Sequence, residues 1–143
     1  MAEKILIVAG SKSDGEIVKK IEEVLDELGI EYKVEYASAH REPERVDKIV
    51  KTTFADVIIA VAGLSAALPG FIASKTKVPV IGVPVSAKLM GMDALLSIVQ
   101  MPPGVPVASV GIDNGKNAAL LAARILALSD KKLEKKLIEY GKK

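Results

Sequence analysis

Residues 31–36 read EYKVEY, and this stretch decides the strand order of the predicted sheet. Its two tyrosines and its valine fall on one face and its charged side chains on the other, which is typical of a strand with one face in water. Residues 4–9 (KILIVA) and 57–62 (VIIAVA) are instead continuous apolar runs, as in strands buried on both faces. The sequence therefore predicts an edge strand at 31–36 and central strands at the two apolar runs.

Helical patterns alternate with strand patterns along the chain. Apolar residues recur at helical spacing over 15–28, Gly29 ends that helix, and Pro43 can begin the next one. Further strands are predicted at 78–83 and 107–112, and further helices at 94–99 and 117–128. This alternation indicates a three-layer α/β fold with one five-stranded parallel sheet. With the edge strand beside the first strand, the order is 2-1-3-4-5, the flavodoxin-like arrangement.

The length of 143 residues predicts one domain over 1–143, with an α/β core at 4–128 and a C-terminal helix at 131–141. The helix at 117–128 is apolar nearly all round, and the C-terminal helix has a narrow apolar stripe beside many lysines. Helices of this kind need cover on more sides than one small domain offers. We therefore expect both helices to pack against neighbouring subunits of a homo-oligomer.

Composition excludes several functional classes. With 20 basic and 18 acidic residues the net charge is +2, which favours neither a nucleic acid nor an anionic membrane as partner. The chain has no cysteine and one histidine, which excludes disulfides, a thiol nucleophile and multi-histidine or thiolate metal sites, so no metal is expected. No apolar run approaches the roughly 20 residues of a membrane span, and the N-terminal residues do not resemble a signal peptide. We expect a cytoplasmic protein.

Three loops follow the first three predicted strands: 10–14 (GSKSD), 38–43 (SAHREP) and 62–70 (AGLSAALPG). In open parallel sheets ligands bind beyond the carboxyl ends of the strands, where the strand order reverses. The only histidine and most of the loop hydroxyls lie in these loops. The loops are therefore the candidate binding site.

The first loop has the glycine spacing of a phosphate-binding loop but lacks its Lys-Ser/Thr pair, so that motif fails. Ser11 and Ser13 would still lie at a helix N-terminus, which favours an anion. Capping explains the same residues: Ser13 and Glu16 have the spacing of a capping box, and Asp14 could be the N-cap. Both interpretations stay open at this point.

The second and third loops differ in chemistry. His40 is suited to proton transfer near neutral pH, and Arg41 can bind phosphate through two N–H groups, although an exposed histidine and an ion pair of Arg41 with Glu42 or Glu44 are the alternatives. The third loop has no titratable group, and its small residues suit either close approach of its backbone to a ligand or a tight strand-to-helix crossing. Together the loops suggest a phosphorylated small molecule, such as a nucleotide, as ligand.

These loops, with segment 83–108 and the NAALLA of 117–122, closely resemble the carboxylases and mutases that act on aminoimidazole ribonucleotide in purine biosynthesis. The resemblance covers about residues 4–128. It implies a flavodoxin-like fold, an octamer, and a reaction on a ribonucleotide and CO2 without metal, biotin or other cofactor. The mutase type moves a carboxylate from the exocyclic nitrogen of N5-carboxyaminoimidazole ribonucleotide to ring carbon C4. The carboxylase type uses aminoimidazole ribonucleotide and CO2 directly.

The resemblance also implies roles for individual residues. His40 matches the general acid/base, and Asp14 matches the residue that reads the ribose, while the backbone of Ala62 and Gly63 matches the imidazole contact. Residues that match the family's ribose-phosphate contacts include Ser11, Ser13, Ser38 and Arg41. Ala39, Ala67 and Leu68 complete the implied substrate-binding set.

One position departs from the mutase pattern. Ala67 stands where mutases usually have histidine, in AAHLPG, and direct carboxylases also lack that histidine. The carboxylases usually carry a more polar AGRSN-like segment, however, and this chain has Leu64 in place of that arginine. SAHR and QMPPGVPV favour the mutase. We predict a mutase, with direct carboxylation as the first alternative and a nucleotide-binding module without turnover as the second.

Overall fold

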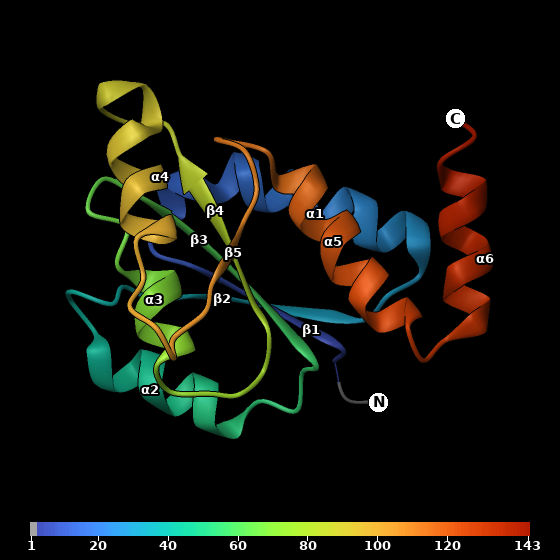
Figure 1. Cartoon of the computed structure of the whole chain (residues 1–143), viewed down its shortest axis with the longest axis horizontal. Coiled ribbons are helices and arrows are strands. Elements are labelled where there is room, and N and C mark those ends of the chain that lie inside the picture. The colour runs from blue at the N-terminus through green and yellow to red at the C-terminus, as the bar shows by residue number, and fades with distance from the viewer. Residues whose placement is uncertain (1–2) are drawn as a thin grey trace.

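The computed structural model describes residues 3–143. One parallel sheet crosses the middle of the molecule, in the order β2-β1-β3-β4-β5, with helices on both faces (Figure 1). The strands are β1 (Ile5–Ala9), β2 (Tyr32–Tyr36), β3 (Val57–Gly63), β4 (Val80–Val85) and β5 (Ala108–Ser109). The predicted fold class and strand order are thereby confirmed.

The strand patterns explain this order. All five residues of β1 are buried, because β1 lies inside the sheet between β2 and β3. Its first residue, Ile5, lies opposite Tyr32 of β2 and Val57 of β3. No residue of β2 is buried to that extent, as expected for an edge strand whose outer face is charged.

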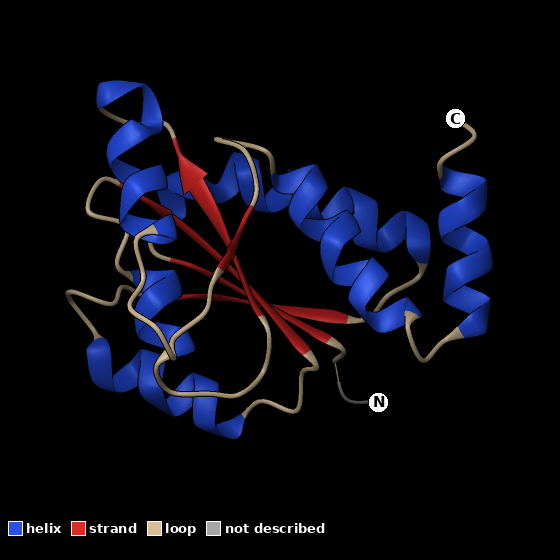
Figure 2. Cartoon of the chain, viewed as in Figure 1, coloured by secondary structure: helices blue, strands red, loops and turns tan. Residues whose placement is uncertain are grey.

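The helices form two layers (Figure 2). α1 (Gly15–Leu28) and α5 (Gly115–Ala127) cover one face of the sheet, and α2 (Pro43–Thr52), α3 (Leu68–Ala73) and α4 (Met92–Val99) cover the other. Two short 3-10 helices, η1 (Lys12–Asp14) and η2 (Leu89–Gly91), precede α1 and α4. Successive strand residues alternate between the two cores: Ile5 and Ile7 pack with α1 and α5, and Leu6 and Val8 pack with the opposite layer.

The last strand and helix α3 differ from the prediction. The last strand is two residues long instead of 107–112: beyond Ser109 the N–H groups of Val110 and Asp113 donate to carbonyls of β4 without regular strand pairing, and the chain turns at Asp113, whose φ is +62°. Helix α3 was not predicted, because its sequence LPGFIA is short and contains both proline and glycine. Proline is tolerated there because it lies in the first turn, where its missing N–H has no partner to lose.

Helix α6 (Lys131–Tyr140) lies beyond α1 and α5, far from the sheet (Figure 1). Its apolar stripe faces its own chain: Leu133 is buried, and Leu137 and Tyr140 pack partly buried against the α1–α5 core. The ammonium group of Lys136 donates a hydrogen bond of 3.2 Å to the carbonyl oxygen of Leu28 at the end of α1. The predicted contact of this helix with other subunits stays a prediction. No helix within residues 3–143 is both long enough and apolar enough to span a membrane.

Candidate active site

The carboxyl ends of three adjacent strands converge at one edge of the sheet. Beyond the end of β1, the N–H of Gly10 donates to the carbonyl of Val61 in β3 (3.0 Å). On the other side, the N–H of Ala37 after β2 donates to the carbonyl of Ala9 (2.9 Å). These two bonds hold the beginnings of all three candidate loops side by side.

The loops enclose an open cavity of about 700 Å³, within the usual range of small-ligand sites. All eleven residues singled out from the sequence line it: Ser11, Ser13, Asp14, Ser38, Ala39, His40, Arg41, Ala62, Gly63, Ala67 and Leu68. The remaining lining residues are Gly10, Leu64, Ser65, Val85, Ser86 and Ala87. Segments separated by more than 50 residues in the sequence therefore share one site.

The serines of the first loop form a local pair. Ser11 is the N-cap of η1, and its hydroxyl oxygen accepts the N–H of Ser13 at 3.2 Å. The two hydroxyl oxygens lie 2.9 Å apart, and both residues are exposed to the cavity. The capping-box interpretation is wrong, because the N-cap of α1 is Asp14 and its side chain makes no capping hydrogen bond. The hydroxyls remain accessible to a ligand.

Asp14 is the one buried charged residue of the described chain, with 7% of its surface exposed, and it lines the cavity. Burial raises the pKa of its carboxyl group, because the charged form loses hydration, and the backbone N–H of Ser11 partly opposes that rise. A buried carboxylate at a cavity wall is a strong acceptor for ligand hydroxyl groups.

A tight turn carries His40 and Arg41. The hydroxyl of Ser38 accepts the N–H of Arg41 at 3.2 Å, and the carbonyl of Ser38 accepts the N–H of Glu42 at 2.8 Å. Pro43 then begins α2. The turn leaves both side chains exposed at the cavity.

Arg41 has no acidic partner within residues 3–143, so the surface ion pair considered as its alternative role is not formed. Glu42 pairs instead with Arg45 (3.7 Å), which also reaches Glu35 (3.2 Å). In the described part of the chain His40 also makes no side-chain hydrogen bond. One cation and one imidazole are therefore available to a ligand.

The third loop supplies the apolar wall. Leu68, at the start of α3, is buried with 2% exposed, and Ala66 lies beneath the wall with 1% exposed. Leu64 adopts a left-handed backbone with φ +54°, uncommon for a leucine, and half of its surface is exposed. No titratable group lies on this wall, as the sequence indicated.

Sequence reasoning missed a fourth wall at the end of β4, formed by Val85, Ser86 and Ala87. The predicted strand stopped at residue 83, whereas β4 extends to Val85, which pairs with Gly63. Since β4 neighbours β3, its carboxyl end belongs to the same edge, and a longer strand would have indicated this wall.

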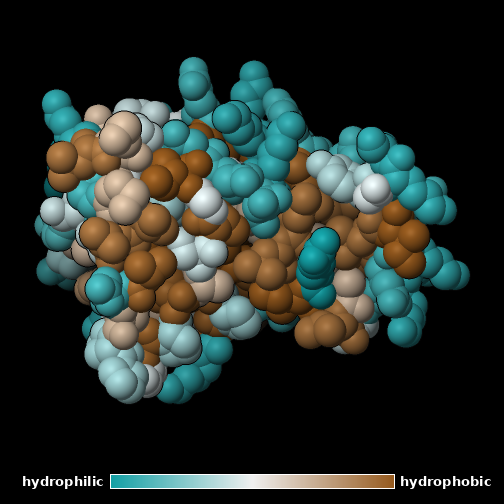
Figure 3. Space-filling view, turned by 45° about the horizontal axis from the view of Figure 1, so that its top comes forward, coloured by the Kyte–Doolittle hydropathy of each residue, from teal (hydrophilic) through white to brown (hydrophobic). Residues whose placement is uncertain are grey.

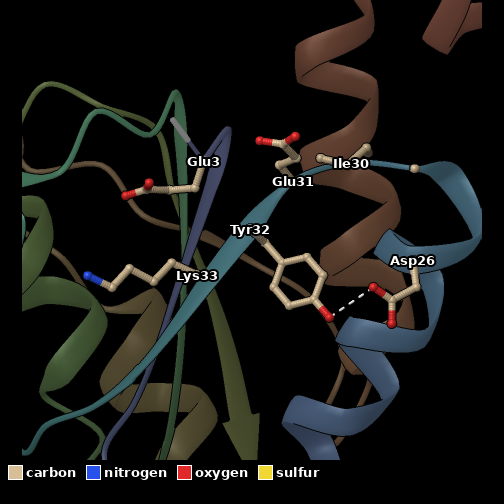
Figure 4. A pocket seen from close by; sticks show the side chains of 7 residues that line it. Glu3, Asp26, Ile30, Glu31, Tyr32 and Lys33 are labelled. Carbon is tan, nitrogen blue, oxygen red and sulfur yellow. Dashed lines mark hydrogen bonds between the residues drawn. The ribbon is translucent and has the colours of Figure 1, made fainter. Parts of the chain in front are cut away.

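A second hollow lies near the amino ends of β1 and β2 (Figure 4). There Tyr32 points toward α1 and donates its hydroxyl hydrogen bonds to Asp26 (2.9 Å) and Glu22 (3.3 Å). Burial and these carboxylates raise the pKa of Tyr32. The Tyr32 hydroxyl joins β2 to α1 through Asp26 and Glu22, so we assign this contact a structural role. Within residues 3–143 no cluster of three or more metal-ligating side chains occurs.

Comparison with known proteins agrees with this geometry. A model of the AIR carboxylase family matches residues 4–143. The chain belongs to the AIR carboxylase family. The family predicted from the five motifs is thereby confirmed.

Relatives and solved structures within this family cover nearly the whole chain. The N5-carboxyaminoimidazole ribonucleotide mutase of Methanocaldococcus jannaschii is 61% identical, over 97% of this chain and 88% of the relative. The enzyme of the same name from Pyrococcus abyssi is 49% identical, over 96% and 81%. The crystal structure of Treponema denticola PurE superposes with a TM-score of 0.89 at 34% identity, covering 96% of this chain and 89% of that one.

Proposed function

We propose that this AIR carboxylase family member is an N5-carboxyaminoimidazole ribonucleotide mutase of purine biosynthesis. It converts that carbamate into 4-carboxy-5-aminoimidazole ribonucleotide. The observation that carries the proposal is one cavity that combines accessible serine hydroxyls, an arginine without an ion pair among residues 3–143, a buried carboxyl group, an imidazole and an apolar wall. Relatives up to 61% identical that carry this enzyme name support it.

Each wall of the cavity binds a different part of the substrate. The hydroxyls of Ser11, Ser13 and Ser38 and the guanidinium of Arg41 bind the ribose phosphate through charge-assisted hydrogen bonds. Asp14 accepts from the ribose hydroxyls. The imidazole ring lies against the third loop, between the backbone of Ala62 and Gly63 and the side chains of Ala67 and Leu68, with Ala39 beside it on the second loop.

The reaction proceeds through CO2. The N–CO2 bond of the carbamate breaks as the exocyclic nitrogen takes up a proton, leaving aminoimidazole ribonucleotide and CO2 beside each other, where the apolar wall keeps both from water. Ring carbon C4 then forms a bond to the CO2 carbon. His40 accepts the proton of C4, which restores the aromatic ring and balances the proton that the exocyclic nitrogen took up.

Direct carboxylation of aminoimidazole ribonucleotide is the second candidate, and Ala67 favours it. An alanine at this position leaves His40 as the one imidazole of the site. A pocket with a single proton carrier suits the C4 half of the reaction, which is common to both types. Protonation at nitrogen then rests on His40 or on water.

Steady-state turnover with each substrate separates these candidates. The measurement is kcat/KM for N5-carboxyaminoimidazole ribonucleotide and for aminoimidazole ribonucleotide with bicarbonate, at one pH, followed by absorbance of the carboxylated product. A higher kcat/KM for the carbamate supports the mutase. A higher value for aminoimidazole ribonucleotide with CO2 assigns a carboxylase, and no turnover with either would leave a nucleotide-binding module.

The proposal includes a homo-oligomer, eight subunits by resemblance, in the cytoplasm. Apolar side chains gather broadly on the face seen in Figure 3, including its left side, where α4 lies. Exposed apolar residues of η2 and α4 are Leu89, Met90, Met92, Leu96 and Val99. Monomers rarely leave such a patch in water. Light scattering should give a mass of several subunits, and a single species of 15.1 kDa would contradict the assembly.

A further inference from the structure

A residue that does not line the cavity, Asp113, binds the fourth wall, which consists of residues 85–87. The backbone N–H of Ser86, just after β4, donates a hydrogen bond of 2.8 Å to the carboxylate Oδ1 of Asp113. Asp113 lies 27 residues further along the chain, in the loop between β5 and α5. Its own N–H donates to the carbonyl of Pro84 at 2.8 Å. One residue therefore binds the end of β4 through two hydrogen bonds.

Asp113 is not needed to cap the helix that follows it. Asn114 is the N-cap of α5, and its side-chain oxygen accepts the N–H of Asn117 at 3.0 Å. The carboxylate of Asp113 is engaged with Ser86, on the site side of the loop. Asp113 also adopts a left-handed backbone with φ +62°. Such a conformation costs free energy in a residue other than glycine and persists where surrounding contacts impose it.

Ile112, the residue before Asp113, contacts the far end of the loop 86–91, which follows β4. A side chain at Gly91 would lie 2.6 Å from the Ile112 side chain and 3.3 Å from the Cα of Ser86. The loop 86–91 is thus closed at its base, with Ile112 packed on Gly91 and Asp113 bonded to Ser86. Residues 112 and 113 together fix where the loop leaves the sheet.

The fixed segment touches the wall to which the proposed function assigns the imidazole ring. A side chain at Gly63 would lie 3.3 Å from the carbonyl oxygen of Val85 and 3.9 Å from the Cβ of Ala87. Segment 85–87 is therefore packed against Gly63 and closes the cavity on that side. A shift of this segment alters the space for the ring and leaves the serines and Arg41 in place.

We propose that Asp113 is a positioning residue for the carboxylate-transfer reaction, holding segment 85–87 against the ring-binding wall through the N–H of Ser86. This inference rests on the proposed function. Asp113 touches no substrate. It acts through the backbone of Ser86, and its effect falls on the ring end of the site.

Three variants of the full chain test this role. Asp113→Ala and Asp113→Gly remove the acceptor, and glycine also relieves the left-handed backbone, so it guards against a loss caused by strain. Asp113→Asn keeps a side-chain oxygen and tolerates positive φ. Asn114→Ala is the matched control, because it removes the α5 cap next door and lowers thermal stability without touching segment 85–87.

We expect kcat/KM to fall about 10- to 100-fold in the alanine and glycine variants, since misplaced site walls have effects of that size. The asparagine variant and Asn114→Ala should stay within about threefold of the unaltered enzyme, a margin well below that range. Affinity for ribose 5-phosphate should be unchanged in all of them. Unaltered kcat/KM in both Asp113→Ala and Asp113→Gly would overturn the proposal.

Amide hydrogen exchange at Ser86 tests the same contact without turnover. The amide should be protected in the unaltered chain and in Asp113→Asn, and exchange faster in Asp113→Ala and Asp113→Gly. If the unaltered chain turns over neither substrate, the proposed function fails while exchange still reports on the contact. Equal protection in all four proteins would overturn the positioning role whatever the activity.

Discussion

The hydroxyl oxygen of Ser38 accepts the backbone N–H of Arg41 at 3.2 Å, across the turn that carries His40. This bond closes the turn between β2 and α2 and presents two functionally distinct side chains to one cavity. Because the bond uses backbone, either side chain can be replaced without opening the turn. Acid/base chemistry and phosphate binding can therefore be tested separately.

Replacing His40 by asparagine should abolish turnover and preserve binding. His40 is the one imidazole of the chain, and general acid/base groups contribute about 10²- to 10⁴-fold to rate. Single-turnover kinetics and calorimetric titration with the product nucleotide measure the two effects. Turnover within about threefold of the unaltered enzyme would remove His40 from the mechanism, since that is far below the expected contribution.

Replacing Arg41 by alanine should weaken substrate binding by about 1.5–3 kcal/mol, the usual contribution of a hydrogen bond to a charged group. The matched control is Arg45→Ala, which removes an arginine four residues away that is engaged with Glu35, Glu42 and the carbonyl of Tyr36. Affinity for ribose 5-phosphate should fall in the first variant alone. Equal losses in both would indicate a general effect of charge.

Asp14→Asn should raise stability at neutral pH while impairing function. Burial raises the folded-state pKa of Asp14 above its ordinary 3.8, so the folded protein binds the proton more tightly than the unfolded chain. The free energy of unfolding therefore falls as pH rises from about that value through the folded-state pKa, and the cost is complete above that pKa. Urea denaturation of the unaltered protein and of Asp14→Asn, at pH 7 and at pH 3, measures the free energy of unfolding of each. The variant's advantage should be present at pH 7 and vanish at pH 3; an equal difference at both would refute it.

Gly115→Ala should destabilise the fold by about 1–3 kcal/mol, the usual cost of overpacking. Its added Cβ would lie 2.8 Å from the backbone carbonyl oxygen of Ile17, where α5 crosses α1. Gly111→Ala is the control, because its nearest neighbour would be 3.8 Å away. Thermal unfolding should show a lower Tm in the first variant alone, and an unchanged Tm in both would mean that the helices can separate freely.

The strand order could be predicted because the residues of each strand indicate whether it is buried on one face or on both. The alternation of 31–36 against the continuous runs of 4–9 and 57–62 distinguished edge from centre. The candidate site followed from the same order, since parallel strands place their carboxyl ends together. The roles assigned to the site residues came from the resemblance and await the experiments above.

Other features depended on contacts between distant segments. The capping-box spacing of Ser13 and Glu16 was local and misleading, because the chain forms η1 there and Ser11 takes the capping role. Strand β5 is two residues long and is followed by the turn at Asp113, and the 107–112 pattern indicated neither feature. Local sequence patterns report propensity, and tertiary packing overrides them at such turns.

By itself the sequence determined which segments are buried, in which order they pair and which loops meet, because hydrophobic periodicity and strand order are properties of the chain. Tertiary structure alone decided that Asp14 is buried at the cavity wall, that Arg41 forms no ion pair among residues 3–143 and that Asp113 reaches Ser86. Burial and hydrogen bonding of a polar side chain depend on groups brought near it from elsewhere in the chain. No local pattern encodes those distances.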